Sequence, residues 1–332
     1  MEWVKNIEKD LEGFRETLGI NFGRIAEKKQ ELDKKRPLPS IALNRIKEDL
    51  YVEWSYNSNS IEGNTLNLNE TRMVLQEGMT VKGKSLREHI EITNHHDAIE
   101  FVEALAQKGK VISEKNILSI HEIVMLKIEK QFAGCYRNGA VRIVGANFAP
   151  PNPLKVNLFM EDLVDFIHSN PLKLNVIEMA AVLHHRFVWI HPFFDGNGRT
   201  VRLLMNLFLM QRGFPPAIIL KNDRKKYYEA LNQANKGSYN KLFLLVAQSI
   251  ERSLDIYLMA HPGGSYDYMP ITSIIEEEKL PYGQEYLSLL ARQGKIDAFK
   301  EGRNWYTSKK AVNDYLSNRK RKRTVALKEH KK

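Results

Sequence analysis

The segment 191–202 reads HPFFDGNGRTVR and combines residue types that suit chemistry on a nucleotide polyphosphate. His191 carries the side chain here whose ordinary pKa lies near neutrality, so it can take a proton from an attacking hydroxyl group. Asp195 offers carboxylate oxygens, which Mg²⁺ prefers as ligands. Arg199 and Arg202 are three residues apart, on one face of a helix, and guanidinium groups make bidentate contacts to phosphate.

A Gly-Asn-Gly turn, formed by Gly196, Asn197 and Gly198, separates the acidic residue from the arginines. Glycine lacks a Cβ atom, so it permits positive φ and lets backbone N–H groups approach an anion closely. The run that follows is apolar and ends before Gly213, which predicts a buried helix over 198–212. The turn is therefore expected at a helix N-terminus, where unpaired N–H groups and the helix dipole favour phosphate.

The combined pattern resembles the signature of the Fic family (filamentation-induced-by-cAMP proteins). Segments 134–151 (GCYRNGAVRIVGANFAPP), 184–199 (HHRFVWIHPFFDGNGR) and 224–237 (RKKYYEALNQANKG) are also similar to Fic sequences, so the resemblance covers roughly residues 85–260. It implies a mainly α-helical core that transfers a nucleoside monophosphate, usually AMP from ATP, to a hydroxyl group of a protein.

The resemblance also implies a role for each residue of the signature. His191 would deprotonate a Ser, Thr or Tyr of the target, and Asp195 would hold Mg²⁺ between the α- and β-phosphates. The arginines would stabilise the leaving β/γ portion, where preorganised donors meet developing charge. The residues expected to bind phosphate are Gly196, Asn197, Gly198, Arg199 and Arg202.

A second motif precedes the signature. Ser58 and Glu62 are four residues apart, on one face of a helix, and Gly63 suits the position that ends it. Read alone, this is a helix end with a solvated glutamate. Many Fic proteins, however, carry an inhibitory helix of this pattern, and the resemblance implies that Glu62 pairs with Arg202 and prevents ATP from binding with its γ-phosphate correctly placed. Some relatives with this glutamate also remove AMP, and this reverse activity stays open.

Residues 141–148 alternate apolar and polar side chains, which predicts a short β-hairpin, although an ordinary connector between helices is the alternative. In Fic proteins the equivalent hairpin is a flap that holds the target by strand addition. The resemblance places these flap residues beside the nucleotide: Val144, Gly145, Ala146 and Asn147. It places these residues beside the adenosine: Tyr227, Tyr228 and Asn235. Both tyrosines fit equally well as core residues of an amphipathic helix.

Helical periodicity dominates the chain. Helices are expected near 5–35, 41–62, 86–107, 114–128, 157–168, 176–188, 198–212, 224–235 and 239–258. The expected organisation is an N-terminal helical region 1–84 with the inhibitory helix at about 45–63, a catalytic core 85–260, a small domain 265–318 and a tail 319–332. The linker before the small domain is marked by Pro262, Gly263 and Gly264.

The small domain is expected to hold two short helices, two strands around a turn at Gly302 and a final helix. Its segment 290–308 resembles winged helix-turn-helix modules of the excisionase-like kind. The basic residues that could face DNA phosphate are Arg292, Lys295, Lys300 and Arg303. Protein docking or dimer packing is the alternative for this module. The tail holds eight Lys/Arg and one Glu, so it carries +7 of the formal charge of +10 and is expected to be disordered, either solvated or attracting nucleic acid or acidic proteins.

Composition sets the remaining expectations. Hydrophobic content of 43% and charged content of 27% are ordinary for a globular protein. No apolar run approaches the roughly 20 residues of a membrane helix, the N-terminal residues show no apolar signal segment, and Cys135 is the single cysteine. These features favour a cytoplasmic protein without a membrane partner.

Three functions compete. The first is a protein adenylyltransferase that uses ATP and Mg²⁺, is regulated by Glu62 and modifies a protein target or itself. The second is a Fic-like phosphotransferase, but that branch replaces the second glycine of the turn, which this chain keeps as Gly198. The third is a DNA-binding regulator, through 265–332, whose core only senses nucleotide; His191 argues against it because sensing requires no base. A homodimer stays open.

Overall fold

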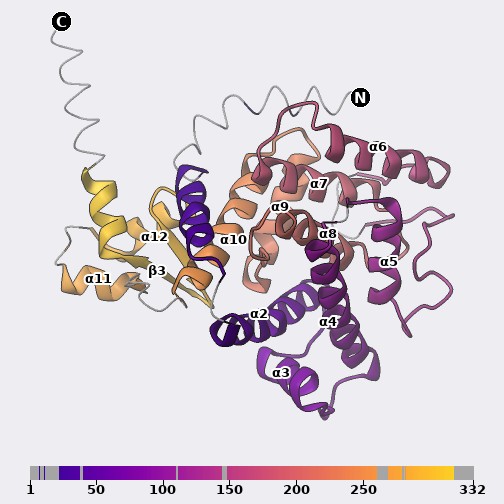
Figure 1. Cartoon of the computed structure of the whole chain (residues 1–332), viewed down its shortest axis with the longest axis horizontal. Helices are drawn as coiled ribbons and strands as arrows, with labels where there is room; N and C mark the ends of the chain where they lie inside the picture. The colour runs from indigo at the N-terminus through magenta and orange to yellow at the C-terminus, as the bar shows by residue number, and fades with distance from the viewer. Residues whose placement is uncertain are drawn as a thin grey trace, which may run out of the picture.

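The structure is a computed structural model, and Figure 1 shows its course. It describes residues 7, 11, 22–37, 40–109, 111–143, 148–259, 268–278, 280 and 282–317. The helices are α2 (Ser40–Ile61), α3 (Leu68–Glu77), α4 (Leu86–Gln107), α5 (Glu114–Val124), α6 (Val156–Ser169), α7 (Val176–Ile190), α8 (Asn197–Met210), α9 (Arg224–Ala234), α10 (Asn240–Met259), α11 (Ile271–Glu277) and α12 (Gln284–Arg292), with short 3₁₀ turns η1 (Pro153–Lys155) and η2 (Lys221–Asp223). The strands are β1 (Tyr268–Pro270), β2 (Ala298–Glu301) and β3 (Asn304–Ser308), and residues 22–34 and 309–317 are also helical.

The helix α8 lies at the centre of the larger helical part of the molecule (Figure 1). It packs against α4, α5 and α7 and also contacts α2. Nearly all of its residues from Asn197 to Leu209 are buried, because neighbouring helices cover it on several sides and its sequence is apolar around most of its circumference. The N-terminal end of α8 is therefore held from several directions.

Helices α2 and α3 precede the expected core and α4 is its first helix, and short turns join the three. The turns end in capping boxes, Asn67 with Glu70 at the start of α3 and Ser85 with Glu88 at the start of α4, in which each side chain satisfies the other residue's backbone N–H. Between α2 and α3 the chain turns at Gly63, whose φ of 110° favours glycine. These local signals fix where α2 stops and where α4 begins.

The C-terminal module contains a small antiparallel sheet of strand order β1-β3-β2, with α11 and α12 packed on their own hydrophobic cluster. The hairpin β2-β3 pairs Ala298 with Thr307 and turns beyond Glu301. A buried amine joins the module to the core, since Lys28 Nζ lies 2.7 Å from Asp255 Oδ1 of α10 and 2.5 Å from Asp297 Oδ1 before β2. The expected helices, hairpin and final helix are present, while the winged-helix assignment itself stays a prediction.

The mainly α-helical fold is confirmed, and most expected helices lie within a few residues of the observed ones. Two differ. The helix α3 was not expected; it is short and mostly polar, and Thr71 and Val74 are its buried residues. The helix expected over 114–128 ends at Val124, after which the chain forms turns. In the expected flap, residues 141–143 and 148 form no strand, and residues 144–147 lie outside the described residues, as does the tail 319–332. The proposed domain limits stay predictions.

Across the part of the chain that the structure describes, no helix combines the length and the apolar character needed to cross a bilayer.

Several histidines of the helical core are buried, and burial lowers their pKa. The pKa falls to about 3 for His184 and to about 4 for His121, His185 and His191, and well below the ordinary value for His95. Each ring is therefore neutral in the folded protein at neutral pH. In an unfolded chain the same rings take up protons near pH 6.5, so below that pH the unfolded state binds more protons than the folded one.

We expect the free energy of unfolding to fall as the pH is lowered from about 6.5 to 4, by up to ~1.4 kcal/mol per pH unit for each such histidine. Urea unfolding followed by circular dichroism at stepped pH measures this slope. His185→Gln removes one of the titrating groups and should lower the slope by about the contribution of one histidine. A stability that stays level over this pH range would contradict the expectation.

Candidate functional site

The loop between α7 and α8 carries the signature residues, and the side chain of Asn197 holds it closed. Asn197 Oδ1 accepts a hydrogen bond from Phe193 N (3.0 Å), and Asn197 Nδ2 donates one to the Phe193 carbonyl (2.8 Å). The Asn197 side chain is therefore buried within the loop. The expected contact of Asn197 with phosphate can therefore be made only by its backbone N–H, at the first residue of α8.

His191 ends α7 in the left-handed conformation, with φ 50° and ψ 62°. A residue other than glycine adopts this conformation only when its surroundings hold it there. Arg137 does so. Its backbone N–H donates to the Pro192 carbonyl (2.8 Å), and its guanidinium donates to the carbonyls of His191 (2.8 Å) and Pro151 (2.7 Å). Sequence reasoning missed Arg137, because it lies far from the signature in the chain.

The His191 ring is buried, and burial lowers its pKa to about 4, against the smaller opposing effects of the Val188 backbone and of the carboxylates of Glu62 and Asp195. The imidazole is therefore neutral at physiological pH. A neutral imidazole can accept a proton from a hydroxyl group placed against it.

The two glycines of the turn are required for different reasons. Gly196 has φ 75°, and a Cβ there would meet Met125 Sδ at 2.9 Å. Gly198 needs no unusual φ, but a Cβ there would lie 2.8 Å from the Cδ of Glu62. An anionic group thus lies directly against the backbone at the start of α8, where the helix dipole favours negative charge.

Arg202 is buried and is held by the end of α2. Its Nε donates to Ser58 Oγ (3.0 Å), and its Nη2 donates to the Ser58 carbonyl (2.8 Å) and to Glu62 Oε1 (2.8 Å). Burial lowers the pKa of Arg202, but the charge and hydrogen bond of Glu62, together with Tyr227 and Tyr228, raise it above the ordinary value. Ser58, Glu62 and Arg202 therefore meet as the motif predicted, with Gly63 forming the turn beyond them.

Arg199 is also buried, with 3% of its side chain exposed, and its pairing is incomplete. Its Nη2 lies 3.4 Å from Asp195 Oδ1 and its Nη1 lies 3.6 Å from Glu91 Oε1. Within the described residues, Nε and Nη1 of Arg199 and Nη1 of Arg202 have no hydrogen-bond partner. Buried guanidinium nitrogens without partners are costly, so the site is built to receive an anion with several oxygens.

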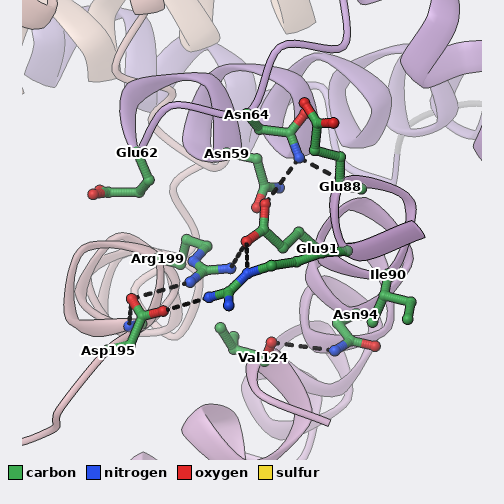
Figure 2. A network of polar contacts seen from close by, with 12 residues as sticks. Asn59, Glu62, Asn64, Glu88, Ile90, Glu91, Asn94, Val124, Asp195 and Arg199 are labelled. Carbon is green, nitrogen blue, oxygen red and sulfur yellow. Dashed lines mark hydrogen bonds and ion pairs between the residues drawn. The ribbon is translucent and has the colours of Figure 1, made fainter. Parts of the chain in front are cut away.

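Asp195 has 40% of its side chain exposed, so its carboxylate can be reached from solvent. Oδ1 accepts a hydrogen bond from Gly196 N (2.5 Å), and Oδ2 pairs with Arg87 Nη2 of α4 (2.9 Å). A reachable carboxylate beside an anion site fits a Mg²⁺ ion that shares phosphate oxygens with it. Figure 2 shows Asp195 facing Arg199, with Glu91 reaching Arg199 from α4.

His121 contacts the same loop, at the Asp195 carbonyl and the Phe193 ring, and its role was not predicted from the sequence. Its ring stacks on Phe193 with the centroids 3.5 Å apart and the planes 2° apart. Gly134 N donates to His121 Nδ1 (3.0 Å), so the ring proton lies on Nε2, which faces the Asp195 carbonyl at 3.0 Å. The contact requires a neutral imidazole, and burial lowers the pKa of His121 to about 4.

The expected adenosine residues divide into two groups. Tyr227 is 2% exposed and its hydroxyl lies 2.7 Å from His184 Nε2, which is a core position. Asn235 Oδ1 lies 2.8 Å from His185 Nε2. Tyr228 is half-buried and lies 5.0 Å from the Arg224 guanidinium, ring centroid to Cζ. The structure thus leaves Tyr228 as the partly exposed aromatic face. The flap residues Val144 to Asn147 lie outside the described residues.

The module proposed for DNA turns its hairpin tip toward the core. Asn222 Nδ2 donates to the Gly302 carbonyl (2.9 Å), and Lys300 Nζ lies 3.4 Å from Asp223 Oδ1. Lys300 is therefore engaged within the chain, while Arg292, Lys295 and Arg303 are exposed. This arrangement favours packing of the hairpin over DNA contact, and a DNA-binding role stays a prediction.

Comparison with known proteins matches residues 111–209 to the Fic/DOC family. The chain is 41% identical over 236 residues to a protein adenylyltransferase Fic of Nematostella vectensis, which covers 69% of this chain and 55% of the relative. It is 36% identical over 276 residues to a protein of the same name from Aedes aegypti, which covers 81% of this chain and 54% of the relative. The chain thus spans about half the length of these curated relatives.

Solved structures agree with this. A Fic domain containing signaling protein from Bacteroides thetaiotaomicron has a TM-score of 0.65 at 28% identity and covers 72% of this chain and 97% of its own. A fragment of Fic-1 from C. elegans has a TM-score of 0.64 at 36% identity and covers 72% of this chain and 71% of its own. With this likeness over most of both chains and the signature assembled in space, the chain belongs to the Fic/DOC family.

Proposed function

We propose that the protein is an adenylyltransferase that transfers AMP from ATP to a Ser, Thr or Tyr hydroxyl of a protein target, including itself. The observation that carries the proposal is the set of buried guanidinium nitrogens on Arg199 and Arg202 that have no hydrogen-bond partner in the described part of the chain, in the same site as the neutral imidazole of His191. The relatives named protein adenylyltransferase support the same activity.

In the proposed reaction, His191 accepts the proton of the target hydroxyl. The hydroxyl oxygen forms a bond to the α-phosphorus while the bond from that phosphorus to the bridging oxygen breaks, and pyrophosphate leaves with the electron pair. Arg199 and Arg202 stabilise the negative charge that develops on this leaving group. The backbone of Gly196 and Gly198 keeps the start of α8 open to phosphate oxygens.

Asp195 would supply a carboxylate ligand to Mg²⁺. When bound, Mg²⁺ would neutralise phosphate charge and orient the α- and β-phosphates.

Glu62 regulates the site in this proposal by competition. Glu62 Oε1 forms an ion pair with Arg202 Nη2, and Glu62 Cδ lies 2.8 Å from the position that a Cβ at Gly198 would take. A γ-phosphate would need the same guanidinium and the same surface of α8. Both groups are anions, so they exclude each other. The Glu62 side chain is 34% exposed, so its carboxylate can move from Arg202 toward solvent.

The first test removes this carboxylate. We expect Glu62→Gly to raise the incorporation of labelled AMP by about 5- to 150-fold, the range of a typical coupling between competing groups. The matched control is Glu77→Gly, because Glu77 also ends a helix and also precedes a glycine but is exposed on α3. Equal labelling by wild type and Glu62→Gly at saturating Mg²⁺-ATP would contradict regulation by Glu62.

The same Glu62→Gly reaction separates the two candidate transfers. A target whose mass rises by the mass of AMP supports adenylyl transfer, whereas a rise by one phosphate would establish the phosphotransferase instead. Intact-protein mass spectrometry of the labelled band gives the answer.

A further test addresses the base. In the Glu62→Gly background, His191→Ala should lower the transfer rate by about 100-fold or more, because a positioned general base contributes that much. Binding of a fluorescent ATP analogue should stay within about twofold, since His191 makes no proposed phosphate contact. Loss of nucleotide binding together with transfer would show that the ring acts through structure rather than as a base.

The pKa of His191 also sets a pH profile. A base whose pKa is about 4 stays unprotonated at higher pH, so the transfer rate of Glu62→Gly should be level from about pH 8 to 5.5 and fall only below it. Initial rates should be taken where circular dichroism reports a folded protein. A rate that already halves near pH 6.5 would contradict the buried, neutral state of the ring.

A further inference from the structure

Each charged side chain of the signature is paired with an oppositely charged side chain from outside it. Arg202 pairs with Glu62 after α2. Arg199 and Asp195 pair with residues of α4, since Glu91 Oε1 lies 3.6 Å from Arg199 Nη1 and Arg87 Nη2 lies 2.9 Å from Asp195 Oδ2. The second pair of contacts is independent of Glu62, because it comes from another helix.

The two α4 residues form a unit of their own. Arg87 and Glu91 are four residues apart, and Arg87 Nε lies 3.3 Å from Glu91 Oε1. Glu91 is 15% exposed and is fixed on its other oxygen, Oε2, by Asn64 Nδ2 at 3.0 Å (Figure 2). Arg87 is 51% exposed, so its ion pair with Asp195 is screened by solvent and its guanidinium can leave Asp195 for water at a small cost in free energy.

The two oxygens of Asp195 have different neighbours. Oδ1 accepts the Gly196 N–H and faces Arg199, so it is directed into the loop. Oδ2 is the oxygen that Arg87 contacts. A divalent cation that binds Oδ2 therefore meets the Arg87 guanidinium there and binds against its positive charge.

We propose that Arg87 competes with the divalent cation for Asp195 Oδ2 and so sets how much cation the site needs before nucleotide binds. This inference rests on the proposed function. It describes a second control that acts on the metal ligand, whereas Glu62 acts on the arginine that would hold phosphate. Removing Glu62 alone leaves the Arg87 contact in place.

The test uses full-length protein carrying Glu62→Gly, with Mn²⁺ as the probe and a non-hydrolysable ATP analogue present. The concentration of free Mn²⁺ is measured by electron paramagnetic resonance. We expect Arg87→Gln to lower the Mn²⁺ concentration at half-saturation by about two- to fivefold, the range of a half-exposed ion pair. Arg87→Lys keeps the charge and should leave it near the parent value.

The matched control is Arg72→Gln, because Arg72 is 44% exposed and pairs with Asp49 at 3.0 Å on the surface of α3 and α2. It should leave Mn²⁺ binding unchanged. Binding of the analogue without metal is measured in parallel by fluorescence or calorimetry. Arg87→Gln should leave that affinity unchanged, because the proposal gives Arg87 no phosphate contact.

Two results would contradict the proposed role of Arg87 without contradicting the proposed function. One is a half-saturating Mn²⁺ concentration that is unchanged or higher in Arg87→Gln. The other is a loss of analogue affinity in Arg87→Gln without metal, which would make Arg87 a phosphate ligand. If the Glu62→Gly parent itself binds no analogue at any Mn²⁺ concentration, the proposed function fails, and the role of Arg87 fails with it.

Discussion

Burial of two guanidinium groups at the start of α8 is the constraint on which the rest of the site depends. Arg199 and Arg202 are 3% and 2% exposed, and a charge removed from water must be paired or it destabilises the fold. The chain places a carboxylate on each of them from its N-terminal helices, yet leaves some of their nitrogens without partners among the described residues. The two carboxylates thus offset the burial of the guanidinium charges, while the nitrogens without hydrogen-bond partners stay available to the oxygens of an anion.

The local part of the site could be predicted because it is contiguous in sequence. The loop between α7 and α8, its glycines and the arginines on one turn of helix follow from short-range spacing. The Glu62–Arg202 pair was predicted from the resemblance to a family, since residues 140 positions apart carry no spacing signal. For the same reason Arg137, His121 and Arg87 were missed. Arg137 and His121 reach the loop through backbone carbonyls and Arg87 reaches it through the Asp195 carboxylate, and such contacts impose no pattern on the sequence.

The C-terminal module is tied to the core through Arg252, which also contacts α2. Arg252 of α10 pairs with Glu53 of α2 at 2.7 Å and donates to the Lys300 carbonyl of β2 at 3.2 Å. Arg224, directly after η2, donates to the Ile61 carbonyl at the end of α2 at 2.7 Å. Of the four basic residues that suggest DNA from sequence alone, Lys300 lies 3.4 Å from Asp223 Oδ1, whereas Arg292, Lys295 and Arg303 are exposed. Composition cannot distinguish a lysine or arginine that binds DNA from one that pairs within the chain.

The close approach of Glu62 to Gly198 has a consequence for how this chain can vary. The carboxylate and a triphosphate would occupy the same patch of backbone, so any side chain that crowded out one would crowd out the other. Under the proposed function, a side chain added within the turn that displaces Glu62 would therefore also weaken nucleotide binding. By the same proposal, variation that changes only the degree of inhibition must arise outside the turn, at Glu62 after α2 or at Arg87 on α4.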